Sequence, residues 1–445
     1  MTKTISSERT RNYLRQIKGA VGYRSVAVFA SFLAIPIMIS YLGPEQFGVW
    51  STLLTVISWV VFFDLGVGNG LRNKVAESLA TKERGEAALY IASGYTLIGL
   101  IAMALWLSAT VISFFIPWQA VFNTQAIAET TLRATVQIAV FFILLNFWIG
   151  LIGALLGAVQ KTSVIALGQL ISNLVVLGLV YVLNLTTDAS ISYLAVIHGF
   201  SLVAANISLS LWFYHRYPEL RPRLYLNKQH TNPLLHVGLQ FFTIQLAVLV
   251  IFTTDKMLIT QLFGPQYVTQ YEVVFKLFSA IIFLHGLISG PLWSAYTDAY
   301  HRDDFQWIEG MLGKQLIIFA GFVIMVIMLC LTAKPIIALW IGRELAVPLP
   351  LILTTSMFVL IFLWNSIFAM LVNGIGKIKL QLYTAIVAML VNIPISMFLV
   401  KHLDMGLSGI VLGTICSLIF AAVALPIQVY YLIKSRWNFC YKLEG

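Results

Sequence analysis

The chain has 445 residues, of which 59% are hydrophobic and 10% charged, and its formal net charge is +10. Soluble domains are about 45–50% apolar and about 25% charged, so this composition excludes a soluble globular protein, a disordered chain and a disulfide scaffold. The long uninterrupted apolar runs also exclude a membrane β-barrel, whose short strands alternate apolar and polar residues. A polytopic α-helical membrane protein remains.

The surplus of bases allows two explanations. Either most lysines and arginines lie in loops on the cytoplasmic side, or some lie inside the membrane because the transported molecule is an anion. A nucleic-acid partner is excluded because no soluble domain or basic tail is large enough to carry such a surface. Cys330, Cys416 and Cys440 fall in or beside apolar runs without a CxxC pair, which favours inert thiols.

Twelve apolar runs reach the roughly 20 residues needed to cross a ~30 Å hydrocarbon core. They lie near 20–41, 47–71, 88–116, 132–157, 163–184, 190–214, 235–262, 268–296, 314–341, 349–373, 380–400 and 406–433. The second run leads into a glycine-rich segment, and the ninth contains Pro335.

The loops between these runs differ in charge. One side of the membrane, which holds both termini, carries 21 lysines and arginines, and the other side carries only Lys334, Arg343 and Lys401. The positive-inside rule therefore places both termini in the cytoplasm. No loop on the outer side is large enough for a catalytic domain.

The second half of the chain echoes the first at an offset of about 220 residues. A Gly-Pro step and two asparagines recur in the same order: Gly43-Pro44 with Gly264-Pro265, Asn146 with Asn365, and Asn173 with Asn392. Chance recurrence is the alternative to a tandem duplication of six spans. A duplication predicts two six-helix halves related by a pseudo-two-fold axis along the membrane normal, with a central cavity between them.

This organisation predicts four segments. An N-terminal six-helix bundle covers 1–214, and its residues 1–19 form an amphipathic cytoplasmic N-terminus. A cytoplasmic linker covers 215–234, a C-terminal six-helix bundle covers 235–433, and a cytoplasmic tail covers 434–445. The first apolar run exceeds signal-peptide length and lacks a cleavage pattern, so we expect it to stay as an uncleaved first helix.

Four bases fall inside predicted spans: Arg24, Arg133, Lys256 and Lys276. A charge near the bilayer centre costs about 2.5–3.5 kcal/mol on insertion scales. Lys256 and Lys276 are predicted at a similar depth in the outer half, where they would line a cavity for an anion. Snorkelling to the headgroups explains Arg24 as well as a ligand role does, and we favour the ligand role; for Arg133 we favour snorkelling.

Titratable groups accompany these bases. Asp255 and Glu272 lie beside the two lysines, either in a self-neutralised structural network or in a cavity lining that exchanges a proton or a sodium ion. The repeat offset places Asp64 within the membrane, opposite His285 in the second half. An acid inside a membrane is a functional hypothesis by default, whereas a lone histidine is more often a packing residue.

Two prolines fall within predicted spans. Pro36 in the first and Pro291 in the eighth are predicted to kink or loosen their helices, although prolines are common in membrane spans. We predict no metal site and no cofactor, with H⁺ or Na⁺ as the coupling ion.

At this point the sequence resembles a known family. The segment YLGPEQFGVW at 41–50, the segment DLGVGNG at 64–70 and twelve spans in two halves are similar to the O-antigen flippases of the Wzx type. These belong to the multidrug/oligosaccharidyl-lipid/polysaccharide exporter superfamily. The resemblance covers the whole chain in length and topology, with its motifs in the first 85 residues.

The resemblance implies a transporter of the bacterial cytoplasmic (inner) membrane and no enzyme activity. Such a protein flips an oligosaccharide repeat unit, linked through pyrophosphate to undecaprenol, from the cytoplasmic to the periplasmic leaflet by alternating access coupled to a cation gradient. Its partners are that lipid-linked oligosaccharide, membrane lipids and the polysaccharide polymerase and chain-length machinery. We assign Arg24 and Lys256 to the pyrophosphate, Lys276 and Arg133 to the cavity potential, and Asp64 to ion coupling, with Asp255, Glu272 and His285 as second choices.

Three rival functions remain. A drug/cation antiporter of the same superfamily would need acids without a basic cavity. A membrane glycolipid polymerase or ligase would need a large outer loop. A purely structural or receptor membrane protein is disfavoured by the repeat and by the membrane charges.

Overall fold

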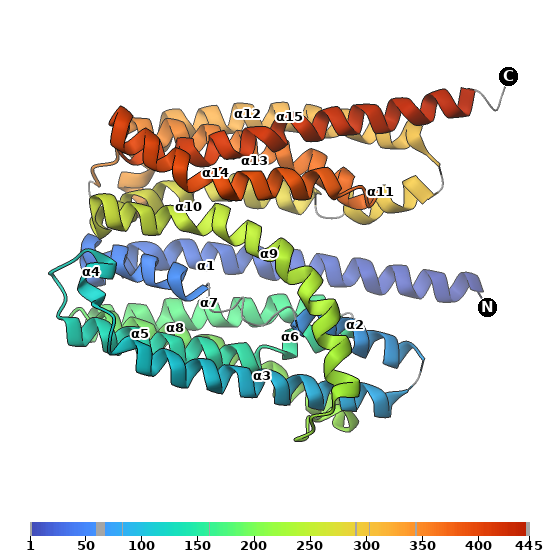
Figure 1. The fold of residues 1–445 in the computed structure, drawn as a ribbon, viewed down its shortest axis with the longest axis horizontal. Coiled ribbons are helices and arrows are strands. Elements are labelled where there is room, and N and C mark those ends of the chain that lie inside the picture. The colour runs from blue at the N-terminus through green and yellow to red at the C-terminus, as the bar shows by residue number, and fades with distance from the viewer. Residues whose placement is uncertain are drawn as a thin grey trace. The chain divides into compact units, whose positions relative to one another are not determined.

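A computed structural model of the protein describes residues 2–58, 67–81, 83–159, 161–289, 292–301, 303–342 and 345–441. Side chains are described from residue 19 onward, apart from 235–252, 435–441 and a few single positions. All regular secondary structure in these ranges is helical (Figure 1). The elements are α1 (Thr2–Ser58), α2 (Val67–Ala80), α3 (Arg84–Ser113), α4 (Trp118–Phe122), α5 (Glu129–Ile149), α6 (Ile152–Ala158), α7 (Thr162–Thr186), α8 (Ile191–Arg216), the 3₁₀ helix η2 (Pro218–Leu220), α9 (Lys228–Phe263), α10 (Pro265–Ser289), α11 (Leu292–His301), α12 (Phe305–Ile341), α13 (Leu349–Gly374), α14 (Lys379–Leu403) and α15 (Gly406–Tyr441).

Ten of the described helical segments are long and apolar enough to cross a membrane. They are Gly19–Val56, Arg84–Ser113, Glu129–Ala158, Thr162–Thr186, Ile191–Arg216, Pro265–Ser289, Phe305–Ile341, Leu349–Gly374, Lys379–Leu403 and Gly406–Lys434. The chain is therefore an all-helical, multi-pass membrane protein. Of the predicted spans, 47–71 begins within α1, and most side chains of 235–262 lie outside the described residues. The total of twelve stays a prediction.

The outer faces of these helices are apolar, as contact with lipid requires. Met103 and Val111 on α3 are 59% and 60% exposed, and Leu331 and Leu339 on α12 are 79% and 87% exposed. Large exposed apolar surfaces of this kind mark contact with a membrane or a partner. Since lipid tails are themselves apolar, such faces are satisfied without burial inside the protein.

Both Gly-Pro steps of the sequence repeat break a helix. Gly43 interrupts α1 with φ 77° and ψ 166°, and Gly264 separates α9 from α10 with φ 105°. A left-handed backbone costs an L-residue about 1–2 kcal/mol, whereas glycine adopts it readily. The following proline has no backbone N–H and begins the next helical segment without losing a hydrogen bond.

The chain divides into two compact units. Unit 1 is Met1–Leu246 with Phe263–Gln266, and unit 2 is Ala247–Leu262 with Tyr267–Gly445. The predicted linker 215–234 includes the end of α8, all of η2 and the start of α9, and it lies within unit 1. The segment bounds predicted from the sequence stay predictions.

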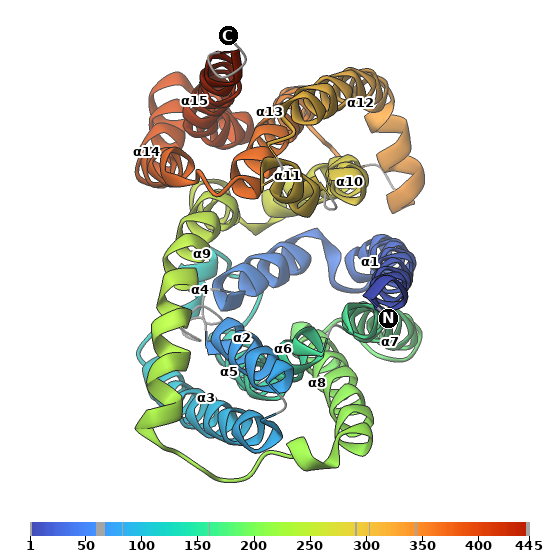
Figure 2. The ribbon, with the colours of Figure 1, turned by 90° about the vertical axis from the view of Figure 1, so that its right-hand side faces the viewer.

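In unit 1 the helices pack side by side. α1 packs on α7, α7 on α8, α8 on α5 and α5 on α3 (Figures 1 and 2). A buried core joins α2, α3, α6 and α8, with Leu71, Ile91, Leu155 and Phe213 fully removed from solvent. This core holds the short helices α2 and α6 against the longer ones.

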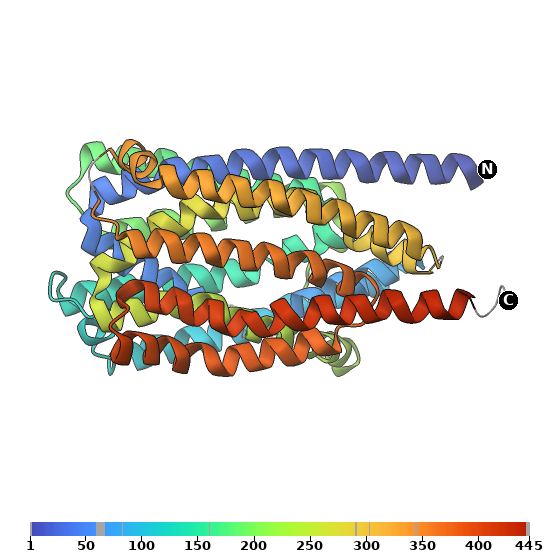
Figure 3. The same ribbon diagram turned by 90° about the horizontal axis from the view of Figure 1, so that it is seen from above.

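In unit 2 the helices α12 to α15 run alongside one another, drawn in orange to red in Figure 3. α15 packs on both α13 and α14, and α11 packs on α12 and α13. Tyr296, Phe368, Leu371 and Leu425 form part of the buried core that joins these helices. α15 is thus the central element against which the polar residues of α14 are placed.

The repeated asparagines make equivalent contacts in the two units. Asn146 on α5 accepts from Asn206 Nδ2 on α8 at 2.7 Å, and Asn365 on α13 donates to the Leu418 carbonyl on α15 at 3.3 Å. In span order, each bond ties the fourth span of a unit to its sixth. This equivalence supports the predicted duplication, while the symmetry axis stays a prediction.

The second pair of asparagines follows the same rule. Asn173 on α7 donates to the Ala27 carbonyl on α1 at 2.8 Å. Asn392 on α14 accepts from Thr254 Oγ1 on α9 at 3.3 Å. Each bond ties the fifth span of its unit to the first. An interhelical hydrogen bond in a membrane protein contributes about 0.6 kcal/mol on average, so these bonds orient helices more than they stabilise them.

Candidate functional site

A buried carboxylate lies at the centre of a polar network in unit 2. Asp255 on α9 is 5% exposed and accepts from Thr414 Oγ1 on α15, at 3.1 Å to Oδ1 and 3.3 Å to Oδ2. Tyr271 on α10 donates from its hydroxyl to Asp255 Oδ2 at 3.3 Å. Among the described residues no lysine or arginine pairs with this carboxylate. In that part of the chain, its hydrogen-bond donors are the hydroxyl groups of Thr414 and Tyr271.

The network continues from Thr414 through Asn392. Asn392 is fully buried, and its Nδ2 donates to Thr414 Oγ1 at 3.0 Å and to Ser417 Oγ at 3.3 Å. The amide oxygen of Asn392 accepts from Thr254, the residue before Asp255. Four helices, α9, α10, α14 and α15, thus contribute to one network, in which hydroxyl groups of α10 and α15 contact the carboxylate and the amide of α14 contacts the Thr414 hydroxyl. Oxygen donors of this kind suit a proton or a hard monovalent cation.

A second polar cluster lies one residue along α9. Lys256 Nζ is 2.6 Å from Glu272 Oε2 on α10, and both side chains are about one-fifth exposed, at 22% and 18%. Lys276, one turn further along α10, interacts electrostatically with both Glu272 and Lys256. The sequence predicted that these three residues share a depth, and the structure brings them together. The cluster thus holds two basic side chains and one acidic side chain.

Arg24 lies on α1 of unit 1. Its side chain is exposed and makes no ion pair with any residue that the structure describes. An unpaired guanidinium has all five donors available for a headgroup or an anionic ligand. The structure therefore leaves both of the predicted roles of Arg24 open.

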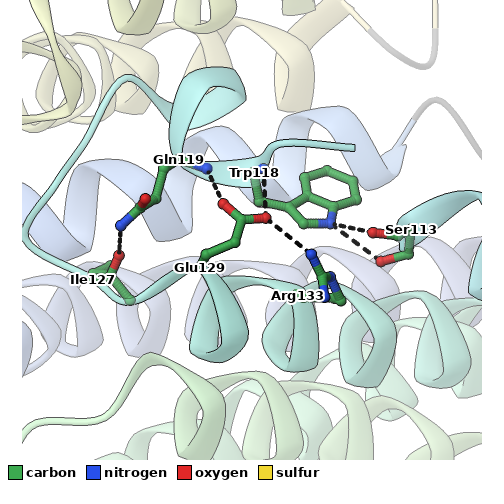
Figure 4. Close-up of polar contacts among 6 residues, drawn as sticks. All are labelled: Ser113, Trp118, Gln119, Ile127, Glu129 and Arg133. Atoms are coloured by element: carbon green, nitrogen blue, oxygen red, sulfur yellow. Dashed lines mark hydrogen bonds and ion pairs between the residues drawn. The ribbon is translucent and has the colours of Figure 1, made fainter. Parts of the chain in front are cut away.

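Arg133 takes part in a set of polar contacts between the end of α3 and the start of α5 in unit 1, here called the clamp (Figure 4). Its guanidinium is 3.5 Å from Glu129 Oε1 and lies over the Phe114 ring at 5.5 Å. Glu129 itself accepts from the backbone N–H groups of Trp118 and Gln119, at 2.9 and 2.8 Å, at the start of α4. A carboxylate at a helix N-terminus is stabilised by the free N–H groups there.

Two further bonds close this clamp. Trp118 Nε1 donates to the Ser113 carbonyl at 3.1 Å, and Gln119 Nε2 donates to the Ile127 carbonyl at 2.9 Å (Figure 4). The segment between α3 and α5 is therefore fixed by its own side chains. Because Arg133 is part of this arrangement, the geometry favours a structural role for it over a contribution to a cavity.

His285 lies inside unit 2 with 2% of its surface exposed. Its Nδ1 is 3.5 Å from Ser289 Oγ, and its ring packs edge-on against Phe322 at 5.6 Å between centroids. Nε2 has no hydrogen-bond partner in the described part of the chain. This environment fits the packing interpretation at least as well as ion coupling.

Three predictions concern residues of the predicted first, second and eighth spans. Asp64 and Pro291 lie outside the described residues. Pro36 lies inside α1, where the one residue with non-helical φ and ψ is Gly43. The large change in direction of this helix is thus set seven residues further along than the proline that we expected to cause it.

The sequence reasoning missed the partners of Asp255. Thr414 and Ser417 are hydroxyl residues three apart in the apolar run 406–433, and hence on one face of a helix. Such a pair inside a span was the available signal. Asn392 was noted only as an anchor of the repeat, although its amide completes the network.

The comparisons with known proteins bear on the whole chain. Residues 21–292 match the family described as polysaccharide biosynthesis protein, which is more than half of the sequence. The chain belongs to this family. This confirms the resemblance to the polysaccharide exporters that the segments at 41–50 and 64–70 indicated.

A similar curated protein is a candidate O-antigen export protein of Yersinia pseudotuberculosis. It is 26% identical over 418 residues, which cover 89% of this chain and 91% of that protein. The two sequences therefore align along almost their full lengths, so the relationship is not confined to one unit.

Solved structures with the same fold are transporters. An inward-facing multidrug resistance transporter of the MATE family, in the MOP superfamily, superposes with a TM-score of 0.78 at 15% identity, covering 93% of this chain and 98% of that one. The lipid II flippase MurJ superposes with a TM-score of 0.70 at 16% identity, covering 94% of this chain and 87% of that one. At these identities the likeness shows the fold alone.

Proposed function

We propose that the protein is a flippase for a lipid-linked oligosaccharide in the cytoplasmic membrane of a bacterium, and not an enzyme. The full-length relationship to a candidate O-antigen export protein carries this proposal. Membership of the polysaccharide biosynthesis family and a fold shared with a lipid II flippase support it. The cargo we propose is an O-antigen-type repeat unit linked through pyrophosphate to undecaprenol, moved from the cytoplasmic to the periplasmic leaflet.

The charges inside the spans suit such a cargo. A sugar–pyrophosphate headgroup cannot cross hydrocarbon unless polar groups replace its water. Lys256 and Lys276 are two bases beside the single acid Glu272, and Arg24 has no ion-pair partner among the described residues. We propose that Arg24 and Lys256 hold the pyrophosphate through charge-assisted hydrogen bonds, with Lys276 raising the local positive potential.

We further propose that Asp255 takes part in coupling to a cation gradient. A carboxylate in a membrane interior is costly when it is charged and unpaired, so it binds either a proton or another cation. The hydroxyl groups of Thr414 and Tyr271 donate to it, Asn392 donates to Thr414 in turn, and loading would neutralise the carboxylate. Alternating access driven by this loading would give transport its direction. Asp64 remains a coupling candidate from the sequence, with Glu272 and His285 as weaker ones.

A drug/cation antiporter is the second candidate function. It is favoured by the TM-score of 0.78 with a multidrug transporter. The basic residues Lys256 and Lys276 disfavour it, because basic side chains in a binding cavity repel a cationic drug. The polymerase and chain-length machinery of polysaccharide assembly are proposed partners of the first function only.

A cellular experiment distinguishes the flippase function from the antiporter function. In a strain that depends on this chain for surface polysaccharide, Lys256→Ala and Arg24→Ala should lower surface polysaccharide at unchanged protein abundance. Lys401→Ala, which removes an exposed lysine at the end of α14, is the matched control and should have no effect. Wild-type levels of surface polysaccharide in both variants, together with altered drug tolerance, would favour the antiporter function over the flippase function.

A further inference from the structure

An apolar groove, here groove A, runs between α3 and α5 of unit 1. It has a volume of about 600 Å³, and its walls include Leu100, Met103 and Leu107 of α3 and Phe141 and Trp148 of α5. The three α3 side chains are each more than half exposed. Both helices are membrane spans, so the groove opens to hydrocarbon and suits an alkyl chain.

A second groove, here groove B, lies on the other side of Trp148, between α5 and α8. It has a volume of about 810 Å³ and is lined by Ile207 and Leu211 among others. Tyr95, Trp148 and Pro222 line both grooves. Trp148 Nε1 donates to the Tyr95 carbonyl at 2.9 Å, so the indole is a fixed wall between the two.

The two grooves meet at one end under residues 217–227, here called the strap. Glu219 of the strap pairs with Arg84 at 2.8 Å, and the Tyr225 N–H donates to Thr96 Oγ1 on α3 at 3.2 Å. These contacts hold the strap against α3. The loop charges predict that this side of the membrane is cytoplasmic.

The strap brings two free cations to this shared end. Arg223 lines groove A and Arg221 lines groove B. Both are exposed, and neither pairs with an acid in the part of the chain that the structure describes. Glu219, the nearest acid in sequence, is paired with Arg84. Leu224, beside Arg223, is 96% exposed and is placed to enter the lipid interface.

Unit 2 contains the counterpart of groove B, here groove C. Six lining positions recur at an offset of 219 residues, so that Ile207 corresponds to Pro426 and His215 to Lys434. Groove C, however, holds Glu309 together with Lys434. The duplicated grooves therefore correspond in position but differ in charge, and among the residues that the structure describes the unpaired arginines line the grooves of unit 1.

We propose that unit 1 binds an anionic phospholipid of the leaflet next to the strap, with one acyl chain in groove A, the other in groove B and the phosphate between Arg221 and Arg223. Guanidinium groups bind phosphate oxygens bidentately, and juxtamembrane bases attract anionic lipids. Two grooves that meet at one cationic end suit a two-chain lipid better than a single polyprenyl chain. The site is independent of the cargo that the protein carries.

Native mass spectrometry of the purified full chain tests this site. The protein is incubated with equal amounts of dioleoyl phosphatidylglycerol and dioleoyl phosphatidylcholine, and the retained lipid is counted. We expect preferential retention of phosphatidylglycerol, with its affinity lowered about tenfold or more in the double variant Arg221→Gln, Arg223→Gln. Lys434→Gln, at the counterpart position of groove C, should leave retention unchanged.

Two further measurements complete the test. Leu107→Trp should fill groove A and lower retention of phosphatidylglycerol while the arginines remain. Equal retention of both lipids by the wild type, or no loss in the double variant, would overturn the proposal. Displacement of phosphatidylglycerol by a polyprenyl phosphate at an equal concentration would also overturn it, because the site would then belong to the cargo.

Discussion

Thr414 on α15 donates a hydrogen bond from Oγ1 to Asp255 on α9, 3.1 Å from Oδ1. It also accepts from Asn392, so one hydroxyl links the buried carboxylate to the amide of a third helix. A change in the charge of Asp255 would alter all these bonds together. Coupling of an ion to helix movement needs such a shared element.

Asp255→Asn is expected to remove cation-dependent transport. The amide cannot bind a proton or neutralise a cation, although it keeps the size of the side chain. Uptake by reconstituted vesicles should fall to the level of protein-free vesicles when an ion gradient is imposed. Glu309→Gln, which neutralises an exposed acid of α12, is the control. An unchanged ion dependence in Asp255→Asn removes this residue from the coupling mechanism.

Thr414→Val should weaken coupling without abolishing it. It removes one donor to a carboxylate, and hydrogen bonds to charged groups contribute about 1.5–3 kcal/mol, so the ion concentration for half-maximal uptake should shift about tenfold or more. Thr384→Val is the matched control, because the Thr384 hydroxyl donates only within its own helix, to the Gln381 carbonyl. A shift of equal size in both variants would count against a specific role for Thr414.

The double variant Lys256→Gln, Glu272→Gln separates the two interpretations of the ion pair. It removes both charges together, so neither partner is left buried and alone. If the pair is only structural, transport should survive. We expect lost polysaccharide export at unchanged abundance, because the cargo would lose its pyrophosphate ligand. Export at the wild-type rate would show that Lys256 serves the fold alone.

Arg133→Gln should lower stability slightly and leave transport intact. The lost pair with Glu129 is partly exposed, so the expected change in the free energy of unfolding is about 0.5–1 kcal/mol. A thermal unfolding scan of the detergent-purified protein would measure it. Reduced transport at unchanged stability would instead show that Arg133 contributes to transport of the cargo.

Gly43→Ala and Gly264→Ala should each destabilise the protein by about 1–2 kcal/mol, because both positions have positive φ. A Cβ on Gly43 would meet no atom within 4 Å, so backbone strain alone acts there. Equal losses in thermal stability would support an equivalent role in the two halves of the sequence repeat. A neutral effect at Gly43 would show that α1 can continue as a straight helix through this position.

Much of the fold could be predicted because bilayer thickness and loop charge leave few alternatives. The apolar runs located the ten segments that the structure describes as long enough to span. The Gly-Pro step marked a positive φ in both halves of the sequence repeat, and the two asparagines marked equivalent interhelical bonds in both units. Helix direction was less predictable: Pro36 was the expected kink, but glycine with its left-handed backbone sets the break at Gly43.

The site was predictable only in part. Spacing alone placed Lys256, Glu272 and Lys276 at one depth, since the turn at Gly264 fixes where two adjacent helices meet. Thr414, which donates to Asp255, comes from α15, more than a hundred residues later, and sequence spacing carries no information about that approach. The role of Arg133 depended on a short helix, α4, that apolar periodicity does not reveal.

The central claim is tested most directly by measuring flipping of a labelled, undecaprenyl-pyrophosphate-linked oligosaccharide in vesicles that contain the purified protein. With an imposed H⁺ or Na⁺ gradient, the account predicts movement of the label to the opposite leaflet in wild-type vesicles and none with Asp255→Asn. Movement in wild-type vesicles that does not depend on either ion would contradict the coupling. No movement of the glycolipid, with gradient-driven efflux of a cationic drug instead, would contradict the flippase itself.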